Sequence, residues 1–125
     1  MRNKLMTDKI TVYEKPTCSK CREVDKLLRE RGIPFEKVNY YIKPLDEKKL
    51  KSLLRKMKLA PRDLLRKSEA IYRELELGKG EHTDDELIAL MVKHPDLIQR
   101  PIVERGSRAA LGRPVENINA VISDD

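Results

Sequence analysis

The two cysteines of this chain, Cys18 and Cys21, form a CxxC motif between an apolar run and a helical pattern. The apolar run at residues 10–13 predicts a short buried strand. The helical pattern over residues 21–31 carries apolar side chains on one face and is followed by Gly32, a residue that commonly ends helices. The start of the chain is therefore constrained to a strand–CxxC–helix unit.

This position has a direct chemical consequence for the motif. A thiol in the first turn of a helix faces unpaired backbone N–H groups and the positive end of the helix dipole. Such surroundings favour the thiolate over the thiol, and the thiolate is the nucleophilic form of cysteine. We therefore predict that the CxxC motif contains a reactive cysteine.

Further strands are predicted on both sides of a long helical region. Residues 34–38 alternate apolar and polar side chains and predict a second strand, which completes a βαβ unit with parallel pairing. Residues 102–104 and 108–111 predict an antiparallel hairpin with its turn at residues 106–107. Pro114 then marks the start of a last helix.

The region between the second and third strands is predicted to be helical. Prolines and glycines divide this region into separate helices. Acidic residues mark the start of one helix, and a capping box that begins at Thr83 marks the start of another. The predicted helical stretches are residues 46–57, 61–65, 68–75 and 83–94.

This order of elements predicts an α/β fold with a four-stranded mixed sheet, βαβ…ββα, and a helical insertion at about residues 44–96. The sequence has no internal repeat and no linker that would separate two domains. We therefore expect a single domain over residues 9–122, preceded by a polar leader at residues 1–8.

The net charge of +6 lies almost entirely in one segment. Residues 43–67 hold ten basic and three acidic residues, whereas the remaining 17 basic and 18 acidic residues nearly balance. Leucines recur at helical spacing in the basic segment, which predicts a solvated helix face, and no nucleic-acid-binding motif accompanies it. No apolar run could span a bilayer, and the N-terminus lacks the apolar core of a signal peptide. We expect a cytoplasmic monomer that binds neither membranes nor nucleic acid directly.

The strand–CxxC–helix unit and the order of elements resemble a thioredoxin-like fold. Over about residues 9–122, the chain more specifically resembles the glutaredoxin-dependent arsenate reductase family. The stretches that carry this resemblance, in family-like order and spacing, are residues 12–18, 62–67, 83–88, 94–103 and 111–114.

The resemblance implies a role for particular residues. Cys18 matches the nucleophile that attacks arsenate, and Arg66, Arg100 and Arg113 match the arginines that hold the oxyanion. Guanidinium groups suit this role, because they bind oxyanions with bidentate geometry and lower the pKa of a neighbouring thiol. Arg22, in the first helix, is a further candidate. The family uses glutathione and glutaredoxin as reductants and no bound cofactor.

One proline and two histidines complete the predictions for the site. Pro101 matches the proline that is cis in thioredoxin-like folds. Zinc would need two ligands besides the CxxC motif, and His82 and His94 do not have a common zinc spacing. We therefore predict no metal site.

Glu14 stands where reductases of this family usually carry a histidine. A charged carboxylate near Cys18 would raise the pKa of that thiol. This departure favours one alternative, a family member that acts on another thiol substrate such as a glutathione adduct.

Cys21 stands where the enzymes usually carry a serine. A helix places Cys18 and Cys21 on one face, so a disulfide between them is geometrically feasible. Cys21 would then resolve the Cys18 adduct in place of glutathione. A CxxC motif here is also typical of Spx-type transcription regulators, a related branch that senses disulfide stress. The second alternative is therefore a redox regulator that binds the RNA polymerase α subunit, although Arg113 favours the enzyme.

Overall fold

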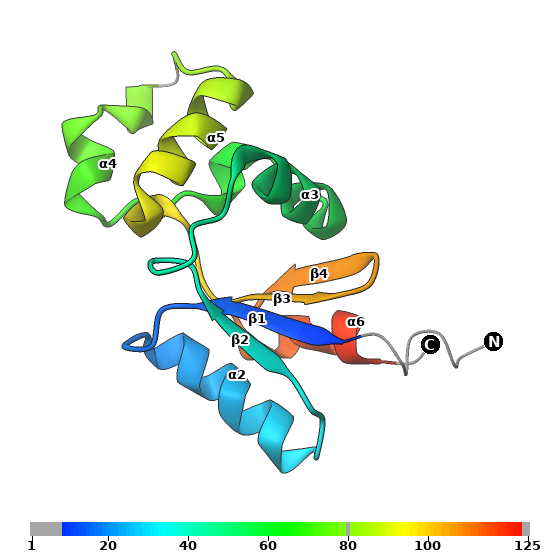
Figure 1. Cartoon of the computed structure of the whole chain (residues 1–125). Helices are drawn as coiled ribbons and strands as arrows, with labels where there is room; N and C mark the ends of the chain where they lie inside the picture. The colour runs from blue at the N-terminus through cyan, green and yellow to red at the C-terminus, as the bar shows by residue number, and fades with distance from the viewer. Residues whose placement is uncertain (1–8, 80, 124–125) are drawn as a thin grey trace. The chain divides into compact units, whose positions relative to one another are not determined.

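The computed structural model describes residues 9–79 and 81–123, which form two compact units. The first unit combines residues 9–43 with residues 100–123, and the second takes the described residues of Pro44–Gln99 (Figure 1). The predicted helical insertion at about residues 44–96 corresponds to the second unit. The leader predicted at residues 1–8 lies outside the described residues, and the single domain over residues 9–122 stays a prediction.

The first unit is built on one mixed sheet in the order β2-β1-β3-β4. Strand β1 pairs with β2 in parallel and with β3 antiparallel, and β3 pairs with β4 antiparallel. This arrangement confirms the predicted four-stranded mixed sheet of a thioredoxin-like fold. The strands are β1 (Ile10–Glu14), β2 (Glu36–Asn39), β3 (Ile102–Arg105) and β4 (Arg108–Leu111).

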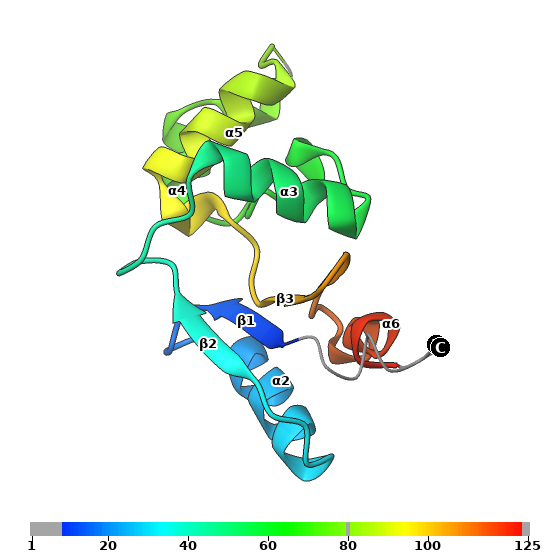
Figure 2. The same cartoon turned by 45° about the vertical axis from the view of Figure 1, so that its right-hand side comes forward.

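The helices of this unit lie on one face of the sheet. They are α2 (Ser19–Glu30) and α6 (Asn119–Ile122), the latter preceded by the 3₁₀ turn η4 (Val115–Ile118). Figures 1 and 2 both place α2 and α6 on the same side of the strands. Apolar side chains from both helices and from alternate strand positions form the core: Ile10, Val12, Val24, Leu28, Val103, Ile118, Val121 and Ile122.

Helix α2 begins two residues earlier than predicted, at Ser19, and ends at Glu30. The cause is Cys18, whose backbone is extended and whose Sγ accepts a hydrogen bond from the N–H of Cys21. Propensity rules look for serine, threonine, asparagine or aspartate in this capping role, so a cysteine cap escapes them. The predicted stop is correct, since Gly32 has a φ of 65°.

The second unit is helical, as predicted. Helix α5 packs against α3 and against the 3₁₀ turns η1 and η3, and the capping box between Thr83 and Glu86 is confirmed. The elements are α3 (Glu47–Met57), η1 (Pro61–Leu64), α4 (Ala70–Glu74), η2 (Leu77–Lys79), α5 (Asp84–Lys93) and η3 (Pro95–Leu97).

Several predicted boundaries are wrong by a few residues. Strand β2 begins at Glu36 because Pro34 has no N–H to pair. Helix α4 is capped by Glu69 rather than Ser68, and the helix ends before Gly78 because Glu76 adopts a left-handed backbone. Pro114 precedes a 3₁₀ turn rather than a helix. The predicted cis bond before Pro101 is present.

Replacing Gly112 with alanine is expected to destabilise the first unit by about 1–3 kcal/mol. A Cβ atom at this position would lie 2.9 Å from Cγ2 of Val24 and 3.0 Å from Cγ of Pro101. Gly78→Ala is the matched control, because its Cβ would make ordinary contacts, the nearest at 3.5 Å from the Tyr72 hydroxyl. Urea unfolding measures both, and equal midpoints for the two variants would contradict the predicted overlap.

Candidate active site

Cys18 lies at the junction between β1 and α2, where the chain turns to enter the helix. Its backbone N–H donates to the carbonyl of Lys15 at 3.0 Å, and the N–H of Cys21 donates to its Sγ at 3.3 Å. The first turn of α2 contains no acidic residue. The sulfur therefore faces the positive end of the helix dipole with no opposing carboxylate in that turn.

These surroundings lower the pKa of Cys18. Burial alone would raise this pKa, since Cys18 is only 7% exposed. The hydrogen bonds from the thiol and the N–H of Cys21, together with the hydrogen bond and charge of Arg100, outweigh burial. Donors and a cation that face a sulfur stabilise the thiolate, so Cys18 is held closer to its nucleophilic form than a free cysteine.

Arg100 is the most deeply buried arginine near the cysteine. Its side chain is 7% exposed, and its Nε and Nη1 atoms have no hydrogen-bond partner among the described residues. Burial acts to lower the pKa of this guanidinium, but Tyr40, Tyr41 and Cys18 outweigh burial and raise the pKa. A buried cation with unused donors is costly, because such groups are ordinarily paired. Arg100 thus offers two hydrogen-bond donors to an anion.

Arg113 contacts the same cysteine from the loop after β4. Its Nη2 donates to Sγ of Cys18 at 3.8 Å, and its Nε donates to the carbonyl of Arg100. The carbonyl of Arg113 in turn accepts a hydrogen bond from the side chain of Asn117. The structure therefore brings together four of the six predicted site residues, which are Cys18, Cys21, Arg100 and Arg113.

Unlike Arg100 and Arg113, the remaining two candidate arginines, Arg66 and Arg22, have no described hydrogen bond to Cys18. Arg66 lies in the second unit, where its guanidinium pairs with Glu69 at 3.2 Å and its N–H donates to the carbonyl of Leu97. Arg22 is exposed on α2, and among residues 9–79 and 81–123 its side chain makes no hydrogen bond or ion pair. The structure therefore does not bring the Arg22 guanidinium to Cys18.

Cys21 is the first inward-facing residue of α2 and is 1% exposed. Burial raises the pKa of Cys21 to about 12, together with the hydrogen bond to Cys18 and the charges of Cys18 and Glu14. The backbone N–H of Lys15 acts in the opposite direction. Both cysteines are free thiols in this structure, and their pKa values are shifted in opposite directions.

A single alkylation by iodoacetamide at neutral pH is expected from this asymmetry. Cys18 has the lowered pKa and reacts, whereas Cys21 is buried and stays protonated. Mass spectrometry of the intact protein and of its peptides measures the number and position of adducts. A first adduct on Cys21, or two adducts that form at equal rates, would contradict this description of the site.

Glu14 occupies the last position of β1 and is 6% exposed. Burial raises the pKa of its carboxyl, Lys37 acts to lower this pKa, and Asp25 acts to raise it. The pKa of Cys18 is lowered on balance by Cys21 and Arg100, so the expectation that Glu14 raises this pKa stays a prediction. The charge of Glu14 does raise the pKa of Cys21.

Sequence reasoning missed the tyrosines that follow β2. Tyr40 is 1% exposed and acts on the Arg100 guanidinium, and the ring of Tyr41 lies 5.0 Å from Nζ of Lys15. The adjacent pair of aromatic residues at the end of a predicted strand was the available signal. Both tyrosines raise the pKa of Arg100 and so support its charge.

Two features are absent from the described part of the chain. No group of three or more histidine, cysteine, aspartate or glutamate side chains within residues 9–79 and 81–123 could hold a metal ion. In the same ranges, every helix is too short or too polar to cross a membrane.

Comparison with known proteins agrees with the fold. The sheet order and a thiol that lies against two arginines at a helix start define a thioredoxin-like protein. The model of the ArsC family matches residues 13–121, and the chain belongs to this family.

Individual relatives match nearly the whole chain. An arsenate reductase of Neisseria meningitidis serogroup A is 41% identical over 114 residues, which cover 90% of this chain and 97% of that protein. The uncharacterized protein YfgD of Escherichia coli K12 is 37% identical and covers 94% of this chain and 99% of its own length. The solved structure of an arsenate reductase from Vibrio cholerae has a TM-score of 0.87 at 36% identity, and it covers 91% of this chain and 98% of that chain.

Proposed function

We propose that this protein is a thiol-dependent arsenate reductase in which Cys18 is the nucleophile. The observation that carries the proposal is the buried Arg100 guanidinium, whose Nε and Nη1 donors are unused beside a cysteine of lowered pKa. Arsenate is a small oxyanion that accepts such donors, and named arsenate reductases are among the relatives.

The proposed reaction transfers two electrons from two thiols to arsenic. The thiolate of Cys18 attacks arsenic, a sulfur–arsenic bond forms, and one arsenate oxygen leaves as water. A second thiolate, from glutathione, then attacks Sγ of Cys18. The sulfur–arsenic bond breaks with its electron pair on arsenic, which leaves as arsenite, and Cys18 is left as a mixed disulfide. A dithiol protein of the glutaredoxin type would reduce this disulfide.

Arg100 and Arg113 are proposed to hold the arsenate oxygens during the attack. Their donors converge on Cys18, and charge-assisted bonds to an oxyanion strengthen as negative charge develops. Arg66 is a proposed third ligand. This role is proposed from the resemblance of its stretch to the family, and Arg66 would exchange its pairing with Glu69 for arsenate.

A coupled assay tests the proposal. Purified protein is mixed with arsenate, glutathione, glutaredoxin and glutathione reductase, and NADPH consumption is followed. Consumption that depends on both arsenate and the protein is expected. Consumption at the blank rate, with Cys18 still reactive to alkylation, would refute the reductase assignment.

The Cys18–Cys21 contact supports a second candidate function, that of a redox regulator. Sγ of Cys18 accepts the N–H of Cys21 and also interacts with its thiol, so the two sulfurs are neighbours. Binding of the RNA polymerase α subunit that depends on the oxidation state of the pair would support this candidate. Equal or absent binding in both states would reject it.

A further inference from the structure

The loop that carries Arg113 is joined to the chain just before β3 by two hydrogen bonds. The backbone N–H of Gly112 donates to the carbonyl of Pro101 at 2.8 Å. The Nε of Arg113 donates to the carbonyl of Arg100. These bonds bring the loop after β4 to the strand start that carries Arg100, and they place the Arg113 guanidinium at Cys18.

Asn117 holds the same loop from the other side. Its side-chain Nδ2 donates to the carbonyl of Leu111 at 3.1 Å and to the carbonyl of Arg113 at 3.1 Å. An asparagine amide has two N–H donors, so one side chain bridges the two residues that flank Gly112. The backbone of Arg113 is therefore fixed by Asn117, while its guanidinium is fixed by the carbonyl of Arg100.

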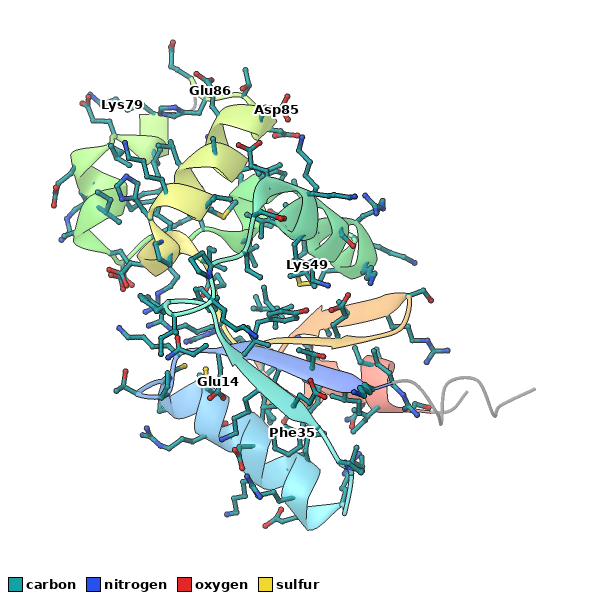
Figure 3. All side chains as sticks on the ribbon, in the orientation of Figure 1. Glu14, Phe35, Lys49, Lys79, Asp85 and Glu86 are labelled. Atoms are coloured by element: carbon teal, nitrogen blue, oxygen red, sulfur yellow. The ribbon has the colours of Figure 1, made fainter. Side chains whose placement is uncertain are left out.

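The core of the first unit holds Asn117 in place. Asn117 belongs to the 3₁₀ turn η4, and the next residue, Ile118, is fully buried in the core with Val24 and Val103. The turn η4 packs against α2, and Figure 3 shows the chain after β4 on the side of the strands that also carries α2. The Asn117 side chain makes no hydrogen bond within residues 9–79 and 81–123 other than its two bonds to the loop. This exposed side chain thus acts on the loop alone.

Arg113 has donors left for an oxyanion. Its Nη2 lies 3.8 Å from Sγ of Cys18, and beyond this contact and the bond from Nε, its guanidinium has no partner in the described part of the chain. The planar fork of a guanidinium binds an oxyanion well only when it is correctly aimed. Neighbouring hydrogen bonds must hold such a group to within about 0.5 Å. The aim of this fork depends on the backbone that Asn117 holds.

We propose that Asn117 is a positioning residue that aims Arg113 at the oxyanion beside Cys18. The inference rests on the proposed function in one respect, that the site takes an oxyanion. The Asn117 amide bonds the loop and not the sulfur, so it acts through Arg113. Without the amide, the loop and the guanidinium move more freely, and the affinity of the site for the oxyanion falls.

Protection of Cys18 by arsenate measures this affinity without any reductant. The rate of alkylation by iodoacetamide is followed in thiol-free buffer at increasing arsenate, and its fall gives the Kd of the anion. Asn117→Ala is expected to raise this Kd by roughly tenfold, about the effect of one charge-assisted hydrogen bond. Asn119→Ala is the matched control and should bind as wild type. It changes an exposed asparagine whose side-chain oxygen accepts a hydrogen bond from Arg31 at 3.0 Å, away from the loop.

A double-mutant cycle separates positioning from a general structural role. Arg113→Met removes the guanidinium and should raise the Kd by more than Asn117→Ala does. Adding Asn117→Ala to Arg113→Met should then have no further effect, because Asn117 acts through the group that is already lost. A side chain that only supported the fold would weaken binding by the same factor in both backgrounds. Urea unfolding of each variant shows that the proteins compared are folded.

An unchanged Kd in Asn117→Ala would overturn the inference, and so would a second loss of equal size in the Arg113→Met background. A wild type that arsenate does not protect would refute the oxyanion site and this inference together. The expected pattern of protection in a protein that fails to reduce arsenate would refute the reductase assignment alone.

Discussion

Replacement of Cys18 by serine is expected to reduce arsenate-dependent NADPH consumption to below roughly one-thousandth of the wild-type rate, as for other enzymes that lose their nucleophile. A serine hydroxyl stays protonated at neutral pH and is a far weaker nucleophile than a thiolate. The site would keep its arginines, so arsenate binding should survive the change.

Stability measurements complete this test. Serine at a helix N-cap is a favoured residue, so Cys18→Ser should unfold at a urea concentration no lower than wild type. Turnover that persists in a folded Cys18→Ser protein would place the chemistry on another residue and end the proposed mechanism.

Replacement of Arg100 by methionine should have the second largest effect. Loss of a buried, charged hydrogen-bond donor costs about 2–5 kcal/mol, which corresponds to a fall in kcat/KM for arsenate of roughly 30- to 4,000-fold. The stability of the fold should not fall, because methionine removes a buried cation whose Nε and Nη1 have no partner in the described structure.

The same variant should change the pH dependence of alkylation. Arg100 lowers the pKa of Cys18, so the wild-type rate should rise with pH and level off below the pH at which a free cysteine does so. In Arg100→Met the pKa rises, and the whole profile should move to higher pH. Arg31→Lys, which changes an exposed arginine in the loop after α2, serves as the control. An unmoved profile in Arg100→Met would show that Arg100 does not stabilise the thiolate.

Most of the fold and several residues of the site could be predicted because their signals are local. The strand–CxxC–helix unit, the capping box at Thr83 and the hairpin are each contained in a few consecutive residues. Cys18, Arg100 and Arg113 were identified from short stretches that resemble a family, and the structure places the two arginines against the sulfur.

The remaining features depend on which residues the folded chain brings together. The capping role of Cys18 arises from its backbone angles and from the N–H of Cys21. The charge of Glu14 raises the pKa of Cys21, since the pleat of β1 directs the Glu14 side chain toward α2. Tyr40 is far from Arg100 in the sequence, but in the folded chain it raises the pKa of the Arg100 guanidinium. Spacing along the chain contains none of this information.

The most direct test of the central claim is a single turnover with the product measured. Reduced protein in excess over arsenate is mixed with glutathione and quenched, and arsenite is separated from arsenate and quantified. The account predicts one arsenite for each arsenate bound, together with one glutathione in disulfide linkage to Cys18 or a Cys18–Cys21 disulfide. Arsenate recovered unchanged from folded protein with a free, reactive Cys18 would contradict it.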